Sequence, residues 1–140
     1  IVNYLGHGSV YRWASESLMN SWNVHSMDNS DRLPVVIMAS CANGFYVFPC
    51  GYYNSMAEDM LYTPNGAVAV VASSGISDPY IQMHLNSGIY ESIFSDGNES
   101  LGAAFTRGKI RVFENAGENG RNVIESFNLF GDPALVIRKR

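Results

Sequence analysis

Val35-Val36-Ile37-Met38-Ala39-Ser40-Cys41 is an unbroken apolar run that ends in a serine and a cysteine. A strand with one exposed face alternates apolar and polar side chains, whereas a strand covered on both faces does not. Residues 67–72, with the sequence Ala-Val-Ala-Val-Val-Ala, form a second run of this kind, and Ser73 and Ser74 follow it. The two runs predict adjacent central strands of a parallel sheet, buried by helices on both faces.

The segments around these runs extend the same pattern. Residues 1–5 indicate a further strand, which ends in the turn Gly6-His7-Gly8-Ser9. Roughly 30 residues separate successive strands, the length of a right-handed crossover that carries a helix. Apolar spacing and helix-start signals predict helices over 14–22, 54–62, 78–93, 100–112 and 122–129, and a final strand over 134–138. The order predicts an α/β fold with a mostly parallel sheet flanked by helices.

Composition excludes several classes of protein. The 140 residues carry a net charge of -4, and Lys and Arg form no runs, so we expect no nucleic-acid partner. No apolar stretch approaches the roughly 20 residues of a membrane span. Two cysteines are too few for a disulfide scaffold, and no histidine has metal-ligand spacing, so we expect no metal site and no required cofactor. Because the chain opens on an apolar strand at Ile1, we expect further strands of the same domain upstream.

The residues after the first two strands suggest thiol chemistry. His7 follows the first strand by two residues, and Cys41 comes directly after the second apolar run. Ligands bind at the carboxyl edge of open parallel sheets, where strand ends gather. A thiolate is a nucleophile that an adjacent imidazole can support, and the N–H groups of Gly8 and Cys41 could stabilise an oxyanion. The alternative is structural, since a histidine in a glycine turn and a buried free cysteine are both common.

Five segments, taken in order, resemble the gingipain family of cysteine peptidases. They are Tyr4-Leu5-Gly6-His7-Gly8-Ser9 with Trp13, Ser40-Cys41-Ala42-Asn43-Gly44, Phe48-Pro49-Cys50 with Ala57-Glu58, residues 66–74, and residues 129–135. The resemblance implies a caspase-like fold, with residues 1–140 as the C-terminal portion of one peptidase domain that bears the catalytic residues. It also implies His7 as catalytic histidine, Cys41 as nucleophile, a protein or peptide substrate, and a secreted or cell-surface bacterial protein.

The resemblance leaves the preferred side chain open. Where gingipains place a tryptophan near the specificity pocket, this chain has Ser77-Asp78-Pro79-Tyr80. We take Trp13, Ser73, Ser74, Asp78 and Tyr80 as candidate substrate-binding residues, with 74–80 as a wall of the pocket. Asp78 has a competing interpretation as the N-cap of the helix that starts at Pro79.

Two further features remain open. Cys50 is expected to be a buried free thiol, since pairing with Cys41 would remove the nucleophile. Asp28, Asn29 and Asp31 form an oxygen-rich loop that could bind calcium as a structural ion, as gingipains do, although a solvated loop is the simpler interpretation.

Three other functions compete with the endopeptidase. A transpeptidase resembling the sortase of type IX secretion would use the same pair of residues. A non-catalytic caspase-like binding domain would not need them. A nucleotide-binding domain would need a phosphate loop, but Gly6-His7-Gly8 lacks the third glycine and a following lysine.

Overall fold

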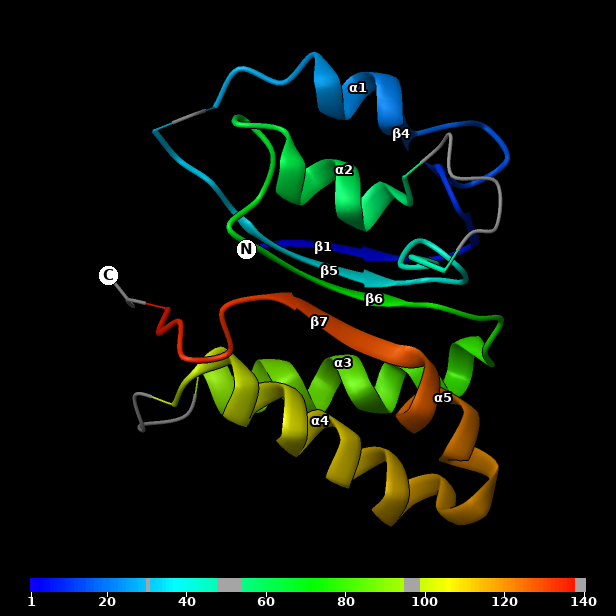
Figure 1. Cartoon of the computed structure of the whole chain (residues 1–140). Coiled ribbons are helices and arrows are strands. Elements are labelled where there is room, and N and C mark those ends of the chain that lie inside the picture. Colours follow the sequence, from blue (N-terminus) through cyan, green and yellow to red (C-terminus); the bar gives the residue numbers. More distant parts are fainter. Residues whose placement is uncertain (30, 48–53, 95–98, 138–140) are drawn as a thin grey trace.

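The computed structural model describes residues 1–29, 31–47, 54–94 and 99–137. Its main sheet contains four strands in the spatial order β1 (Val2–Leu5), β5 (Val35–Ala39), β6 (Ala69–Ser73) and β7 (Phe127–Gly131). The first three are parallel, and β7 is antiparallel to β6 (Figure 1). The prediction of adjacent, central, parallel strands at the two apolar runs is therefore confirmed.

Helices cover both faces of this sheet (Figure 1). One face carries α1 (Ser21–His25) and α2 (Met56–Tyr62), and the other carries α3 (Pro79–Phe94), α4 (Leu101–Ala116), the short 3₁₀ helix η1 (Gly117–Gly120) and α5 (Arg121–Ser126). A small antiparallel sheet of β2 (Gly8–Ser9), β3 (Arg12–Trp13) and β4 (Met19–Asn20) follows β1 in the chain. The result is a three-layer α/β arrangement.

Alternate side chains of β5 and β6 contribute to two separate cores, because successive residues of a strand point to opposite faces. Val35, Ile37, Ala69 and Val71 pack with buried residues of α3, α4 and α5. On the opposite face, the intervening side chains of both strands pack with α1 and α2, including the methionines Met56 and Met60. All ten residues of the two strands are buried, which explains why neither run alternates in polarity.

Two predicted elements are wrong. Residues 14–22 are not a helix: β4 and the start of α1 occupy the end of this segment, and Leu18 and Trp22 are 71% and 82% exposed. The last strand of the sheet is β7 rather than 134–138, where the described residues contribute only an isolated bridge between Ser100 and Val136. The predicted helix over 122–129 ends at Ser126 for the same reason, since Phe127 turns into the sheet.

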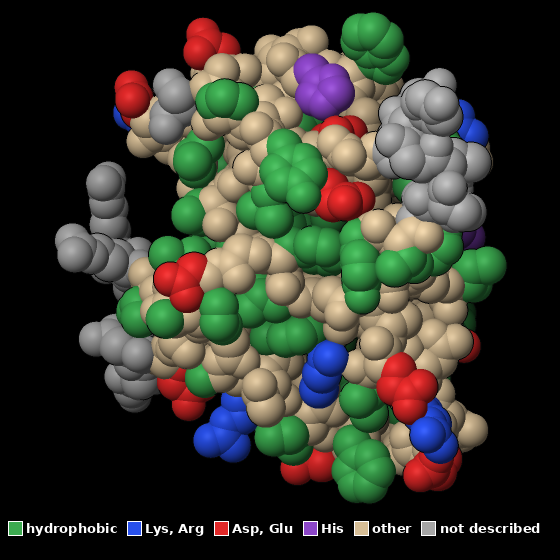
Figure 2. All heavy atoms as spheres, in the orientation of Figure 1, with side chains coloured by type: hydrophobic (Ala, Val, Ile, Leu, Met, Phe, Trp, Pro, Cys, Tyr) green, Lys and Arg blue, Asp and Glu red, His purple; other side chains and the backbone are tan. Residues whose placement is uncertain are grey.

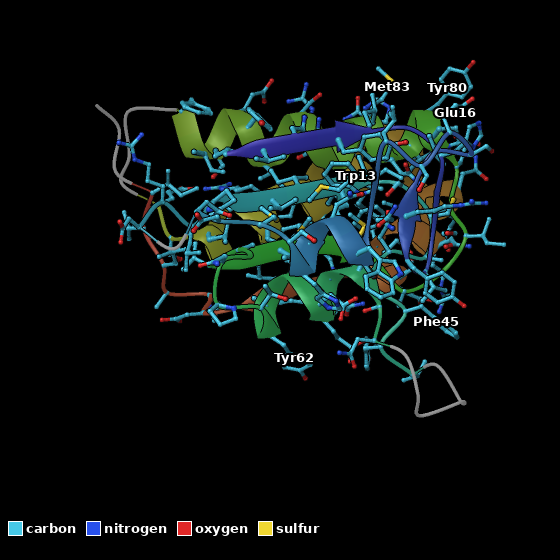
Figure 3. All side chains as sticks on the ribbon, turned by 90° about the horizontal axis from the view of Figure 1, so that it is seen from above. Trp13, Glu16, Phe45, Tyr62, Tyr80 and Met83 are labelled. Atoms are coloured by element: carbon cyan, nitrogen blue, oxygen red, sulfur yellow. The ribbon has the colours of Figure 1, made fainter. Side chains whose placement is uncertain are left out.

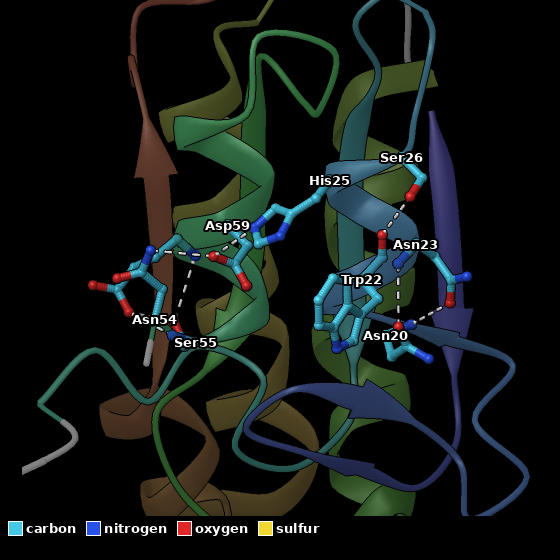
Figure 4. A network of polar contacts seen from close by, with 9 residues as sticks. Asn20, Trp22, Asn23, His25, Ser26, Asn54, Ser55 and Asp59 are labelled. Atoms are coloured by element: carbon cyan, nitrogen blue, oxygen red, sulfur yellow. Dashed lines mark hydrogen bonds and ion pairs between the residues drawn. The ribbon is translucent and has the colours of Figure 1, made fainter. Parts of the chain in front are cut away.

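Polar contacts fix α1 against α2 (Figure 4). Each helix begins with a capping box, at Asn20 for α1 and at Ser55 for α2. The last residue of α1, His25, places Nε2 3.3 Å from Oδ1 of Asp59, whose side chain is 7% exposed, and Asn54 donates to the same oxygen at 3.1 Å. His25 therefore joins the end of α1 to α2 through Asp59.

The surface is mixed in character. Figure 2 shows apolar side chains across the middle of one face, at the level of the sheet, with Lys and Arg as separate groups around them. Among the described residues, no helix is long and apolar enough to cross a membrane.

Candidate active site

The ends of β1 and β5 bring the predicted catalytic residues to one edge of the sheet. Leu5 pairs with Ala39 in the parallel ladder, and Gly6 N–H continues the pairing by donating to the Ala39 carbonyl at 3.2 Å. His7 and Cys41 each lie two residues beyond that last pair, on strands whose spacing is about 4.8 Å. His7 is exposed and Cys41 is half-buried, so both can be reached from solvent.

Gly8 brings the loop after β1 into contact with the loop after β5. A Cβ atom placed on Gly8 would lie 2.8 Å from the Cys41 carbonyl oxygen and 2.9 Å from Ser40 Cβ, closer than a real side chain approaches. Only glycine permits this contact without displacement of the Cys41 backbone. The proximity of the two loops was first inferred from strand order. The close approach of Gly8 to the Cys41 backbone supports it directly.

The two proposed oxyanion donors are the N–H groups of Gly8 and Cys41, and the strand ladders of the described residues do not use them. Ala14 N–H donates to the His7 carbonyl at 2.8 Å, so Gly8 and Trp13 form a non-hydrogen-bonded pair and the Gly8 N–H points away from β3. Within the described part of the chain, no acceptor receives the Cys41 N–H. Both groups therefore stay candidates for binding an oxyanion.

Cys41 sits on a sharp turn. Ala42, the next residue, has φ 59°, in the left-handed region that costs a non-glycine residue about 1 kcal/mol or more. Its N–H donates to the Gly75 carbonyl at 3.0 Å, and Gly44 N–H donates to the Ser73 carbonyl at 2.8 Å. The Cys41 Sγ atom lies 3.6 Å from the Ser77 carbonyl oxygen. The loop after β6 therefore borders the thiol, and the role of 74–80 as a wall of the substrate pocket stays a prediction.

Three candidate substrate-binding residues have other roles in this structure. Trp13 is 7% exposed and stacks on Tyr4, with ring centroids 4.5 Å apart, so its indole belongs to the core. Ser73 is fully buried and its hydroxyl is bonded to the Gly75 carbonyl and to Ser126 Oγ. The Ser74 hydroxyl donates to the Ser126 carbonyl at 3.0 Å. Trp13 and Ser73 are therefore buried structural residues, and the Ser74 hydroxyl joins the loop after β6 to the end of α5.

Asp78 and Tyr80 lie at the start of α3. Asp78 Oδ1 accepts from the N–H groups of Tyr80 at 2.8 Å and Ile81 at 3.3 Å, which is the N-cap arrangement. Tyr80 is 78% exposed, and Figure 3 shows it beyond the carboxyl ends of the parallel strands. The cap interpretation of Asp78 is thus supported, and Tyr80 stays a candidate for substrate contact.

Sequence reasoning missed three polar residues that support the site. Tyr4 Oη donates to the His7 carbonyl at 2.6 Å, and burial, the main cause, raises the pKa of Tyr4 above its usual value. Gln82 is 1% exposed and its Nε2 donates to the carbonyl and hydroxyl oxygens of Ser77, at 3.2 and 2.7 Å. Asn43 is fully buried between the loops. The only available signal was a polar residue inside an apolar or glycine-rich pattern.

Two further predictions concern calcium at the oxygen-rich loop of Asp28 and the free thiol at Cys50. Among the described residues, no three His, Cys, Asp or Glu side chains cluster as a metal site, and Asn29 donates to the Gly66 carbonyl at 3.3 Å. Calcium at Asp28, Asn29 and Asp31 stays a prediction. Cys41 is a free thiol, while Cys50 and its neighbours Phe48 and Pro49 lie outside the described residues.

A mostly parallel sheet between helices, with a cysteine and a histidine after adjacent strands, defines the class of protein: an α/β fold of the cysteine-peptidase type. A sequence model of peptidase family C25 matches residues 1–138, and the chain belongs to that family. The resemblance to gingipains noted in the sequence is thereby confirmed.

Individual relatives agree with this assignment. Gingipain R2 and Gingipain R1 of Porphyromonas gingivalis are each 29% identical to this chain over 144 residues, which cover 99% of it. The crystal structure of the Arg specific cysteine proteinase gingipain R superposes with a TM-score of 0.88 at 27% identity, over 98% of this chain. The chain spans 19% and 14% of the two curated relatives and 33% of the solved one, and it therefore has the fold of part of their peptidase domain.

Proposed function

We propose that this protein is a cysteine endopeptidase in which Cys41 is the nucleophile and His7 its proton-transfer partner. One observation carries the proposal. His7 and Cys41 stand at the same position past a shared ladder pair, Leu5 and Ala39, on adjacent parallel strands. Two independent structural residues would have no reason to occupy equivalent positions at the edge where such sheets bind ligands.

The chemistry follows from these groups. His7 accepts the thiol proton of Cys41 as the sulfur attacks the carbonyl carbon of a peptide bond, and the N–H groups of Gly8 and Cys41 stabilise the oxyanion that forms. Collapse of this intermediate breaks the C–N bond, and His7 donates a proton to the departing amine. Water then attacks the thioester and releases the second product, which restores the thiol. Nothing in this sequence of steps requires a metal or an organic cofactor.

The proposal extends to partners and location. The substrate is a protein or peptide chain, bound along the edge formed by the loops after β1, β5 and β6. We expect the remainder of the same peptidase domain to complete the substrate pocket, since the chain covers a third of its solved relative. We also expect a secreted or cell-surface protein of a bacterium, as the family resemblance implies.

Thiol reactivity tests the nucleophile directly. In the full-length protein, iodoacetamide should alkylate Cys41 before Cys50, because a thiol that can ionise at an open edge reacts faster than a buried one. Cys41→Ser and His7→Ala should each abolish peptide cleavage and leave the circular dichroism spectrum unchanged. Labelling of Cys50 with Cys41 inert, or undiminished cleavage by Cys41→Ser, would contradict the proposal.

A further inference from the structure

Asn43 is a buried amide that joins the two loops of the candidate site. Its side chain is fully buried, a rare environment for asparagine, where every polar atom needs a partner. Nδ2 donates to the carbonyl oxygens of Ser9 at 2.6 Å and Arg12 at 3.3 Å, which belong to the two strands of one hairpin. Oδ1 accepts from the hydroxyl of Ser40, which is also fully buried.

The partners of this amide are the neighbours of the proposed oxyanion donors. Ser9 directly follows Gly8, and Ser40 directly precedes Cys41. A planar amide group of fixed dimensions therefore spans the interval between the Gly8 backbone and the Cys41 backbone. Asn43 Oδ1 would lie 2.6 Å from a Cβ on Gly8, so the amide also limits how closely the two loops approach.

Helix α2 also binds both the Cys41 loop and the hairpin of β2 and β3. The Asn43 carbonyl accepts from Ala57 N–H at 2.9 Å, and the Val10 carbonyl at the tip of the hairpin accepts from Met56 N–H at 2.8 Å. Two consecutive N–H groups in the first turn of α2 therefore bind the Cys41 loop and the hairpin, one each. The Asn43 amide adds a side-chain bridge between the same two segments.

We propose that Asn43 is a positioning residue that fixes the separation of the Gly8 and Cys41 N–H groups. This inference rests on the proposed peptidase function, because the two groups matter as a pair only if they bind one oxygen. A donor displaced by an ångström loses most of its effect on a developing charge. An aliphatic side chain would fill the same volume but make no hydrogen bond to the Ser9 or Arg12 carbonyl, and so would not hold the loops in register.

Two variants of the full-length protein test this role. Asn43→Asp keeps the shape and the acceptor for Ser40, but it replaces the donor with an oxygen that repels the Ser9 and Arg12 carbonyls. Ser40→Ala is milder and removes only the hydroxyl that orients the amide, so it serves if Asn43→Asp does not fold. Val112→Ala, in α4 on the other face of the sheet, is the control for lost stability, because Val112 is fully buried and remote from these loops.

The expected signature separates oxyanion binding from thiol reactivity. On a peptide that the wild type cleaves, kcat should fall about tenfold or more in Asn43→Asp, and less in Ser40→Ala, with KM nearly unchanged. Affinity for the matching peptide aldehyde should fall in parallel. The Cys41 sulfur adds to the aldehyde carbonyl carbon and no group leaves, so the adduct keeps the oxygen that the Gly8 and Cys41 N–H groups bind. Iodoacetamide alkylation of Cys41, which forms no oxyanion, should keep its rate. Val112→Ala should change none of the three in the folded protein.

Two results would overturn the inference alone. Folded variants with the kcat of the wild type would show that the amide does not set the donors. Equal losses in turnover and in alkylation would show that Asn43 supports only the Cys41 turn. A wild type that neither cleaves peptides nor alkylates at Cys41 would instead overturn the peptidase proposal, and this role with it.

Discussion

Gly8 has the most restrictive environment among the residues of the site. A side chain at this position would clash with the Cys41 carbonyl, the Ser40 side chain and the Asn43 amide, which all lie within 3 Å of where a Cβ atom would be. The Cys41 carbonyl belongs to the backbone and cannot rotate aside as a side chain could. A pattern of glycine, histidine and glycine is common in sequences, but here the second glycine has a specific steric reason.

Gly8→Ala should therefore reduce activity more than stability. The added methyl group forces the loop after β1 away from Cys41, so we expect kcat/KM to fall by about a hundredfold, the scale of a removed oxyanion donor. Gly102→Ala is the matched control, because its Cβ would meet Pro133 Cβ at 2.8 Å, far from the site. Peptide cleavage and thermal unfolding of both variants decide the matter. Equal kcat/KM in the two folded variants would count against a Gly8 donor.

A substitution at Asp78 separates its role as a helix cap from a role in substrate specificity. Its Oδ1 caps α3, and asparagine accepts the same hydrogen bonds, so Asp78→Asn should change the free energy of unfolding by less than about 0.5 kcal/mol. If the carboxylate also anchors a basic substrate, turnover of Arg and Lys peptides should drop at least about tenfold. Because the cap accounts for the geometry, we expect turnover to be unchanged. A selective loss on basic peptides would overturn this expectation.

At the scale of elements, the central strands and the longer helices were predictable, whereas the segment over 14–22 and the last strand of the sheet were not. β5 and β6 were predicted from sequence because burial on both faces removes polar residues from the strand itself. α3 was predicted because Leu85, Ile89 and Ile93 repeat at four-residue spacing, and all three are buried. Residues of other elements bury these strands and this helix, but the apolar pattern lies within each segment and is therefore visible in a single sequence.

The misplaced elements depend on contacts that apolar spacing does not reveal. Leu18 and Trp22 are spaced as a helix would space them, yet both are exposed, so their spacing carries no information about packing. The segment folds as β4 and α1 because Trp13 pairs with Met19 and because Asn20 caps α1. Phe127 extends a strand rather than a helix because the free edge of β6 accepts it, opposite Ser73.

The residues of the candidate site were likewise predictable only in part. His7 and Cys41 were predicted because each closely follows an identifiable strand. The supporting amides of Asn43 and Gln82 were not, because their partners are carbonyl groups of other segments. A backbone carbonyl leaves no trace in the sequence, so such partnerships require coordinates.

The contact between α3 and α4 offers a prediction for two packed elements. Gly88 lies against Gly108, where a Cβ on Gly88 would be 2.8 Å from the Gly108 Cα, and a Cβ on Gly108 would be 2.8 Å from the Leu85 carbonyl. Gly108→Ala gains up to about 1 kcal/mol of helix propensity. It also forces the helices apart at a cost of about 1–3 kcal/mol. We expect net destabilisation in chemical denaturation. Ser87→Ala, exposed on α3, should stay within about 0.5 kcal/mol of wild type, and a stabilised Gly108→Ala would contradict the crossing.

At the scale of the whole molecule, the two edges of the sheet differ. At one edge, β7 pairs with β6 and its residues are buried or half-buried except for Gly131. On the other side, β1 pairs with β5, and no described strand lies beyond it. Val2 and Leu5 of β1 are 41% and 48% exposed, and Ile1, directly before the strand, is 44% exposed, which leaves an apolar surface at this edge. Because the solved relative is about three times as long as this chain, the edge at β1 is where we expect the rest of the domain to pack.

Residues 1–140 expressed alone should consequently self-associate through β1. An exposed apolar strand with unpaired N–H and carbonyl groups is a template for pairing with another chain. Light scattering after gel filtration should show dimers or larger species. Val2→Lys should shift the population to monomer, because a charged side chain on an edge strand opposes pairing. Tyr62→Lys is the control: Tyr62 is 70% exposed and lies on the opposite side of the molecule from β1 (Figure 3), so its replacement should leave the association unchanged. A monomeric wild-type fragment, or equal effects of the two lysines, would show that β1 is not the edge that the remainder of the domain covers.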